Sequence, residues 1–187
     1  MQDLAWVRWL FTDLTRELSQ LSLTPAAKTD QPWVTSQLWR SYVMQQFRPR
    51  IGPVLRHAWL AAEKGHTRGL RRLSEQLASQ ERPLAEKKAS IAAAGILLRT
   101  TRTALHQGPL GKLRAAIQAN ACPAEWPIVW ATLGSIYQLG LANVVGEFLR
   151  LEWHFLTRQM PIKPSPARGE FSIAHLVREA LEPLALQ

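Results

Sequence analysis

The sequence has one cysteine, few acidic residues and no convincing alternation of apolar and polar residues. Its single Cys122 excludes an intrachain disulfide. Without period-two alternation the sequence gives no support for a β-sheet, and we find no internal repeat at solenoid spacing. The N-terminal pattern is amphipathic and lacks the solid apolar run of a secretory signal. We therefore expect an all-helical fold and, by default, a cytoplasmic protein.

Motifs that carry chemistry are also missing. The sequence contains no P-loop pattern, no G-x-G-x-x-G and no G-x-S-x-G, so nucleotide binding and α/β-hydrolase chemistry have no support. No two histidines have the three- or four-residue spacing that places metal ligands on one helix face. Glu147 and Glu152 are five residues apart, and we expect Arg150 and His154 to satisfy them. The sequence thus predicts no metal, no cofactor and no catalytic residue.

Acidic residues are scarcest in the middle of the chain. The net charge is +9, and residues 40–114 hold fifteen Lys or Arg against four Glu. Such a basic segment is typical either of a solvated surface or of a surface that contacts phosphates. The segment contains no recognisable helix-turn-helix and no aromatic platform. A basic helical module that binds nucleic acid or another protein therefore stays open as an alternative function.

Apolar residues recur at spacings of three and four along most of the chain, which predicts a bundle of about seven to nine helices. We expect one helical domain over residues 1–162, beginning with a helix over residues 3–22. Pro49, Gly52 and Pro53 should force a bend or a loop in the second helix. Residues 163–187 should form a proline-rich linker followed by an amphipathic helix capped by Ser172.

The longest uncharged run, residues 126–146, is about as long as a membrane span. Polar residues such as Thr132, Ser135 and Asn143 interrupt it, and the mean hydropathy of the chain is −0.13. A helix that is apolar all round is equally typical of a bundle core. We therefore interpret residues 122–162 as a buried helical hairpin and keep a membrane-associated protein as the alternative.

Two stretches resemble the UreF family of urease accessory proteins. In residues 78–99 the resemblance lies in acidic, basic and serine positions followed by a glycine and a leucine pair, and the family-motif residues are Glu81, Glu86, Ser90 and Gly95. In residues 126–162 it lies in Trp-Pro-Ile-Val-Trp and in the closing Arg-Gln-Met-Pro-Ile. Residues 1–32 lack the glycine-rich segment usual in the family, so the chain resembles a divergent member.

The resemblance implies a non-catalytic scaffold that helps to insert nickel into apo-urease. Its partners would be the D/H-type accessory protein and the G-type GTPase, and we also expect a homodimer. By analogy with the family, the C-terminal segment would contact the D/H-type partner. The residues implied in that contact are Arg158, Pro161, Ile162, Phe171, Ile173, Leu176 and Leu181.

Overall fold

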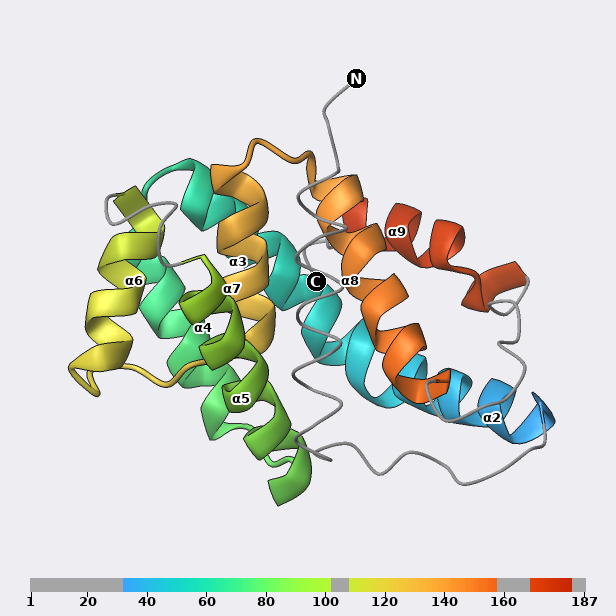
Figure 1. Cartoon of the computed structure of the whole chain (residues 1–187). Helices are drawn as coiled ribbons and strands as arrows, with labels where there is room; N and C mark the ends of the chain where they lie inside the picture. The colour runs from blue at the N-terminus through green and yellow to red at the C-terminus, as the bar shows by residue number, and fades with distance from the viewer. Residues whose placement is uncertain (1–31, 102–107, 158–168, 183–187) are drawn as a thin grey trace.

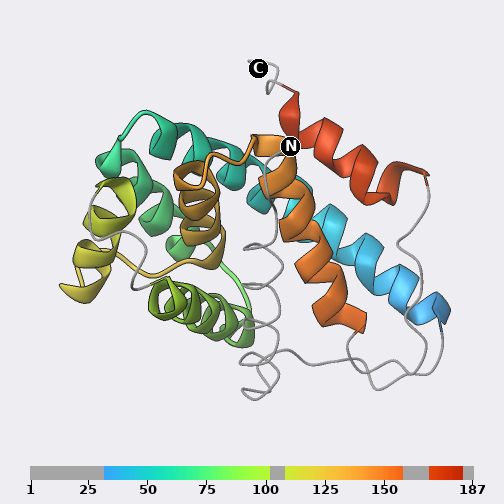
Figure 2. The same ribbon diagram turned by 45° about the horizontal axis from the view of Figure 1, so that its top comes forward.

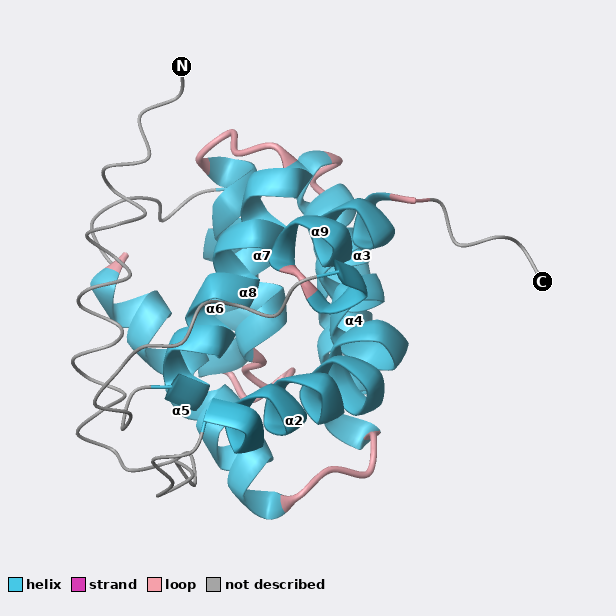
Figure 3. Ribbon diagram, turned by 90° about the vertical axis from the view of Figure 1, so that its right-hand side faces the viewer, coloured by secondary structure: helices cyan, strands magenta, loops and turns pink. Residues whose placement is uncertain are grey.

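We analysed a computed structural model that describes residues 32–101, 108–157 and 169–182. Within these ranges every regular element is a helix, which confirms the all-α prediction (Figure 3). The helix expected over residues 3–22 lies outside the described residues. The elements are α2 (Pro32–Tyr42), η1 (Val43–Ile51), α3 (Gly52–Glu63), α4 (Thr67–Ser79), α5 (Leu84–Thr100), α6 (Gly108–Gln118), α7 (Trp126–Ile136), α8 (Leu141–Thr157), η2 (Gly169–Phe171) and α9 (Ile173–Leu181).

The prolines expected to interrupt the second helix widen it instead. Residues 43–51 form a π-helix between α2 and α3, with Pro49 inside it. The backbone N–H of Gly52 donates to the carbonyl of Phe47, five residues earlier, as π geometry requires. Because proline has no N–H and clashes with a regular turn, the wider turn lets the helix continue past it. The interruption is therefore a π-helix and not a loop.

Helix α7 lies at the centre of the bundle, surrounded by α3, α5, α6 and α8 (Figure 1). All of residues 126–135 are buried. The first half of the long uncharged run is thus core, because a helix covered on every side can be apolar all round. Among the described residues, no helix has the length and apolar character needed to span a bilayer.

Helices α7 and α8 approach each other closely at Gly134. A Cβ atom added at this position would overlap the side chain of Val144 on α8. Near the same point the indole Nε1 of Trp130 donates to the carbonyl of Val144 at 2.9 Å. The predicted hairpin is therefore confirmed, and glycine is needed for its close packing.

The C-terminal helix α9 lies on the body of the protein beside α8 (Figure 2), and it also contacts α3. Ser172 caps it by accepting a hydrogen bond from the N–H of His175 at 3.2 Å, as predicted. Its Leu176 is fully buried, and Arg48 in η1 forms an ion pair with Glu179 at 2.9 Å. In both views α9 lies on the opposite side of the bundle from α5 (Figures 1 and 2).

Candidate functional site

A buried ionic network joins the start of α5 to the start of α7. Arg82 Nη2 lies 2.7 Å from the Glu125 Oε1, and each side chain is only 2% exposed. Ser90 donates to the second carboxylate oxygen of Glu125 at 2.7 Å. The Ser90 hydroxyl also accepts from the backbone N–H of Trp126 at 3.0 Å. These bonds fix where α7 enters the core, because a buried carboxylate is stable only when its oxygens are satisfied.

The network follows from the sequence spacing on α5. Arg82, Glu86 and Ser90 are four residues apart, which places them along one side of the helix and its preceding turn. Pro83 has extended backbone angles and precedes the first helical residue, as expected for a helix start. Glu86 then lies in the first turn, 3.9 Å from Arg82. This side of α5 faces α7 and the pocket beside it.

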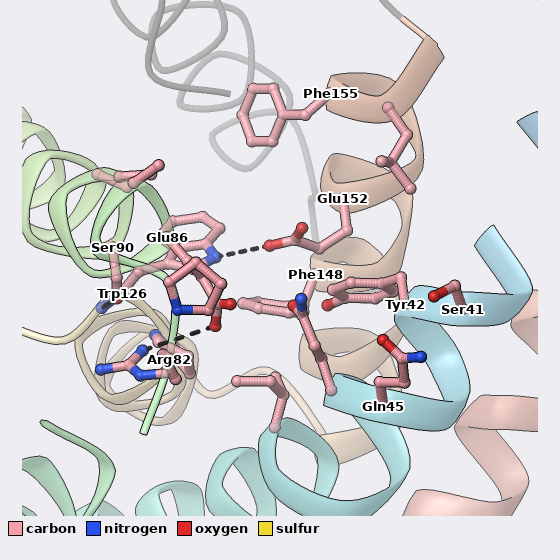
Figure 4. A pocket seen from close by; sticks show the side chains of 18 of the residues that line it. Ser41, Tyr42, Gln45, Arg82, Glu86, Ser90, Trp126, Phe148, Glu152 and Phe155 are labelled. Atoms are coloured by element: carbon pink, nitrogen blue, oxygen red, sulfur yellow. Dashed lines mark hydrogen bonds and ion pairs between the residues drawn. The ribbon is translucent and has the colours of Figure 1, made fainter. Parts of the chain in front are cut away.

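The pocket beside the network has a volume of about 380 Å³. It lies between α2, η1, α5, α7 and α8, and its walls are mostly apolar. Trp126 and Phe148 stack in the wall with their ring centroids 5.3 Å apart. Figure 4 shows Tyr42, Glu86 and Glu152 pointing toward the space between α5 and α8. Pockets with apolar walls and a few convergent polar groups are typical ligand sites.

The two carboxylates of this pocket, Glu152 and Glu86, have raised pKa values. Burial raises the pKa of Glu152 from 4.5 to about 7; the hydrogen bond from Trp126 Nε1, at 3.1 Å, opposes this shift and the charge of Glu86 adds to it. Burial also raises the pKa of Glu86, and Arg82 partly offsets that effect. Near neutral pH Glu152 is therefore present in both its protonated and its ionised form.

Tyr42 adds an unpaired polar atom to the pocket. Its hydroxyl is buried and has no hydrogen-bond partner within the described part of the chain. Burial raises its pKa well above 10.0, with the charges of Glu152 and Glu86 as further causes. The phenol is therefore neutral at physiological pH and can both donate and accept a hydrogen bond.

The family-motif residues have different places in the structure. Ser90 belongs to the buried network and lines the pocket, together with Glu86. Glu81 is exposed, and its carbonyl accepts from Arg50 at 3.3 Å. Gly95 lies farther along α5, where an added Cβ would meet only the end of Arg99 at 3.5 Å. The structure thus brings two of the four to the site.

Four of the seven residues implied in partner binding lie elsewhere, in η2 and α9. Leu176 is buried against the body, Phe171 and Ile173 are partly buried, and Leu181 is 39% exposed. The carbonyl of Phe171 accepts from Trp39 Nε1 at 2.8 Å, and its ring lies 5.1 Å from the Arg40 guanidinium. The remaining three residues, Arg158, Pro161 and Ile162, lie outside the described residues.

Sequence reasoning missed the residues that give the pocket its charge. Arg150 and His154 were expected to satisfy Glu147 and Glu152, but the Glu152 carboxylate accepts a hydrogen bond from Trp126 on another helix. Arg150 does pair with Glu147, as expected. A signal for Glu152 existed, because an acidic residue in an apolar stretch of helix is expected to have a partner elsewhere. Nothing local in the sequence pointed to Tyr42.

Much of the basic middle segment is used inside the fold. Arg82 and Arg114 are buried, and Arg114 donates to the carbonyl of Leu98 at 2.6 Å. Other arginines of the segment donate to the protein, namely Arg48, Arg50, Arg56 and Arg71. Their charge therefore stabilises loops and helix ends in addition to giving the protein a basic surface. Over the residues that the structure describes, no group of His, Cys, Asp and Glu could hold a metal ion.

Comparison with known proteins identifies one family. The model of the UreF family matches residues 33–151, more than half of the chain, from α2 into α8. Comparisons with curated proteins and with solved structures found no significant match. The matched region contains the buried network and most of the pocket lining, but it ends before Glu152, Phe155 and Leu156.

Proposed function

The chain belongs to the UreF family of urease accessory proteins, and from this we propose that it is a non-catalytic scaffold for urease maturation. Membership implies an accessory role in inserting nickel into urease. We propose further that the chain bridges the D/H-type accessory protein and the G-type GTPase beside apo-urease in the cytoplasm. The family match over residues 33–151 is the observation that carries this proposal.

The outer face of α9 is the surface that we propose for the D/H-type partner. Leu176 anchors the helix to the body, so a partner would contact the side that faces away from it. Leu181 is 39% exposed there, and Ala174 and Arg178 are exposed as well. A small apolar centre with a charged rim is typical of a protein interface. A homodimer stays a prediction.

Substitution of Leu181 tests this surface without removing the helix. We expect the full-length L181E variant to lose co-purification with the D/H-type accessory protein, because a carboxylate would be buried in the contact without a partner. L84E is the matched control, since Leu84 is 67% exposed and lies on α5, on the other side of the bundle. It should leave co-purification unchanged.

The deletion of residues 169–187 complements the point variant. It should also abolish co-purification, but it uncovers the surface that Leu176 buries, so its thermal unfolding must be measured alongside. Retention of the partner by both L181E and the deletion variant would contradict the proposed contact. Loss of the partner by L84E to the same extent would show that the effect is not specific to α9.

A further inference from the structure

The pocket between α2, α5, α7 and α8 has no role in the proposed scaffold, yet its chemistry is specific. One part of its wall is aromatic, formed by Trp126, Phe148 and Phe155. The polar groups Glu86, Glu152 and Tyr42 line the space between α5 and α8, where Glu86 lies beside Arg82 and Glu152 beside Trp126 (Figure 4). Its volume of about 380 Å³ suits a molecule much larger than water.

The charges that line the pocket are not balanced. Among the described residues that line the pocket, Arg82 is the only basic one, and its guanidinium is held by Glu125 at 2.7 Å, outside the polar end of the pocket. Glu86 lies 3.9 Å from Arg82, and the positive charge of Arg82 favours its ionised form. Glu152 forms no ion pair with any of the described residues and accepts one hydrogen bond, from Trp126. Among the described residues, Glu152 is therefore the carboxylate of this pocket that lacks a cation.

We propose that this pocket binds a small organic cation, a primary ammonium group carried on an apolar body of aromatic size. The ammonium group donates to Glu152 and to Glu86, and its third N–H can reach the Tyr42 hydroxyl, which lacks a partner. The apolar body lies against Trp126 and Phe148. This site goes beyond the scaffold function and does not depend on it.

Two physical effects favour this ligand class. A buried carboxylate is costly unless a cation pairs with it, so an ammonium group gains more here than it would at an exposed acid. Aromatic faces attract cations, and the attraction is stronger in a desolvated site. A neutral or anionic ligand of the same shape gains neither effect. Selection between an amine and its alcohol analogue is therefore the property that distinguishes this site from an unspecific apolar pocket.

A titration with 2-phenylethylammonium tests the proposal on the full chain. Binding is followed by NMR through the indole N–H of Trp126, which donates to Glu152, at pH 8 where Glu152 is mostly ionised. We expect saturable shifts with the amine and at least about tenfold weaker binding of 2-phenylethanol. The E152Q variant should bind the amine about tenfold more weakly and the alcohol unchanged.

The control is E147Q, because Glu147 is on the same helix but pairs with Arg150 outside the pocket. It should bind the amine like the unchanged protein. Equal affinity for amine and alcohol would overturn the proposal. So would the absence of any shift, which would also be the result if another part of the chain filled the pocket. An equal loss of amine affinity in E152Q and E147Q would assign the effect to net charge and likewise refute the site.

Discussion

The buried pair of Arg82 and Glu125 should contribute more to stability than any exposed ion pair of this protein. Substitution E125Q keeps the shape of the side chain, so it removes a charge without opening a cavity. Among the described residues, the Arg82 guanidinium, 2% exposed, then keeps only Glu86 at 3.9 Å as an ionic neighbour. Removing one partner of a buried pair costs about 3–5 kcal/mol. We expect E125Q to lose about 3 kcal/mol of unfolding free energy, since the amide oxygen still accepts hydrogen bonds.

Urea denaturation followed by far-ultraviolet circular dichroism measures this loss. The control is E147Q, because Arg150 in the pair with Glu147 is 55% exposed, and it should cost less than about 1 kcal/mol. The double variant R82M/E125Q should lose less than the sum of its single variants, because it leaves no orphaned cation. If E125Q were no more destabilising than E147Q, or if the losses were additive, the network would not stabilise the entry of α7.

Two further substitutions test the packing and the electrostatics of the core. G134A should destabilise the protein by about 1–3 kcal/mol, because its methyl group would overlap Val144. G95A should be neutral or slightly stabilising, because its methyl group meets only the flexible end of Arg99. Equal unfolding free energies for the two variants would contradict the close α7–α8 contact. The raised pKa of Glu152 means that the folded state holds its proton more tightly than the unfolded state. Stability should therefore fall as pH rises from about 4.5 to about 7, by at most about 3 kcal/mol. Because E152Q cannot ionise, its stability relative to the unchanged protein should increase over this pH window, and a constant difference in urea midpoints would refute the shift.

The two proposals concern different parts of the bundle: ligand binding in the pocket and partner binding at the outer face of α9. The family match covers most of the pocket but ends at residue 151 within α8, before Glu152 and before the α9 surface. A variant of the pocket should therefore leave co-purification with the D/H-type accessory protein intact, and L181E should leave amine binding intact. This independence allows either proposal to fail without affecting the other.

The sequence by itself determined the helical class, the position of most helices and the buried hairpin. These features depend on residues three or four positions apart, such as the apolar run of α7 and the cap at Ser172, and local spacing records them directly. The family-motif residues were also visible in the sequence, although the role of Ser90 in holding Glu125 was not.

Only the tertiary structure decided which distant groups meet. Arg82 and Glu125 are 43 residues apart, and Trp126 and Glu152 are 26 apart, so no local periodicity connects them. The structure also placed α9 on the body, where its apolar face packs against α8. An amphipathic helix shows that one of its faces will be covered, but the choice of the covering surface depends on the shape and the charge that the other helices assemble. For the same reason the protonation of Glu152 is a property of the folded core and could not be read from its neighbours in sequence.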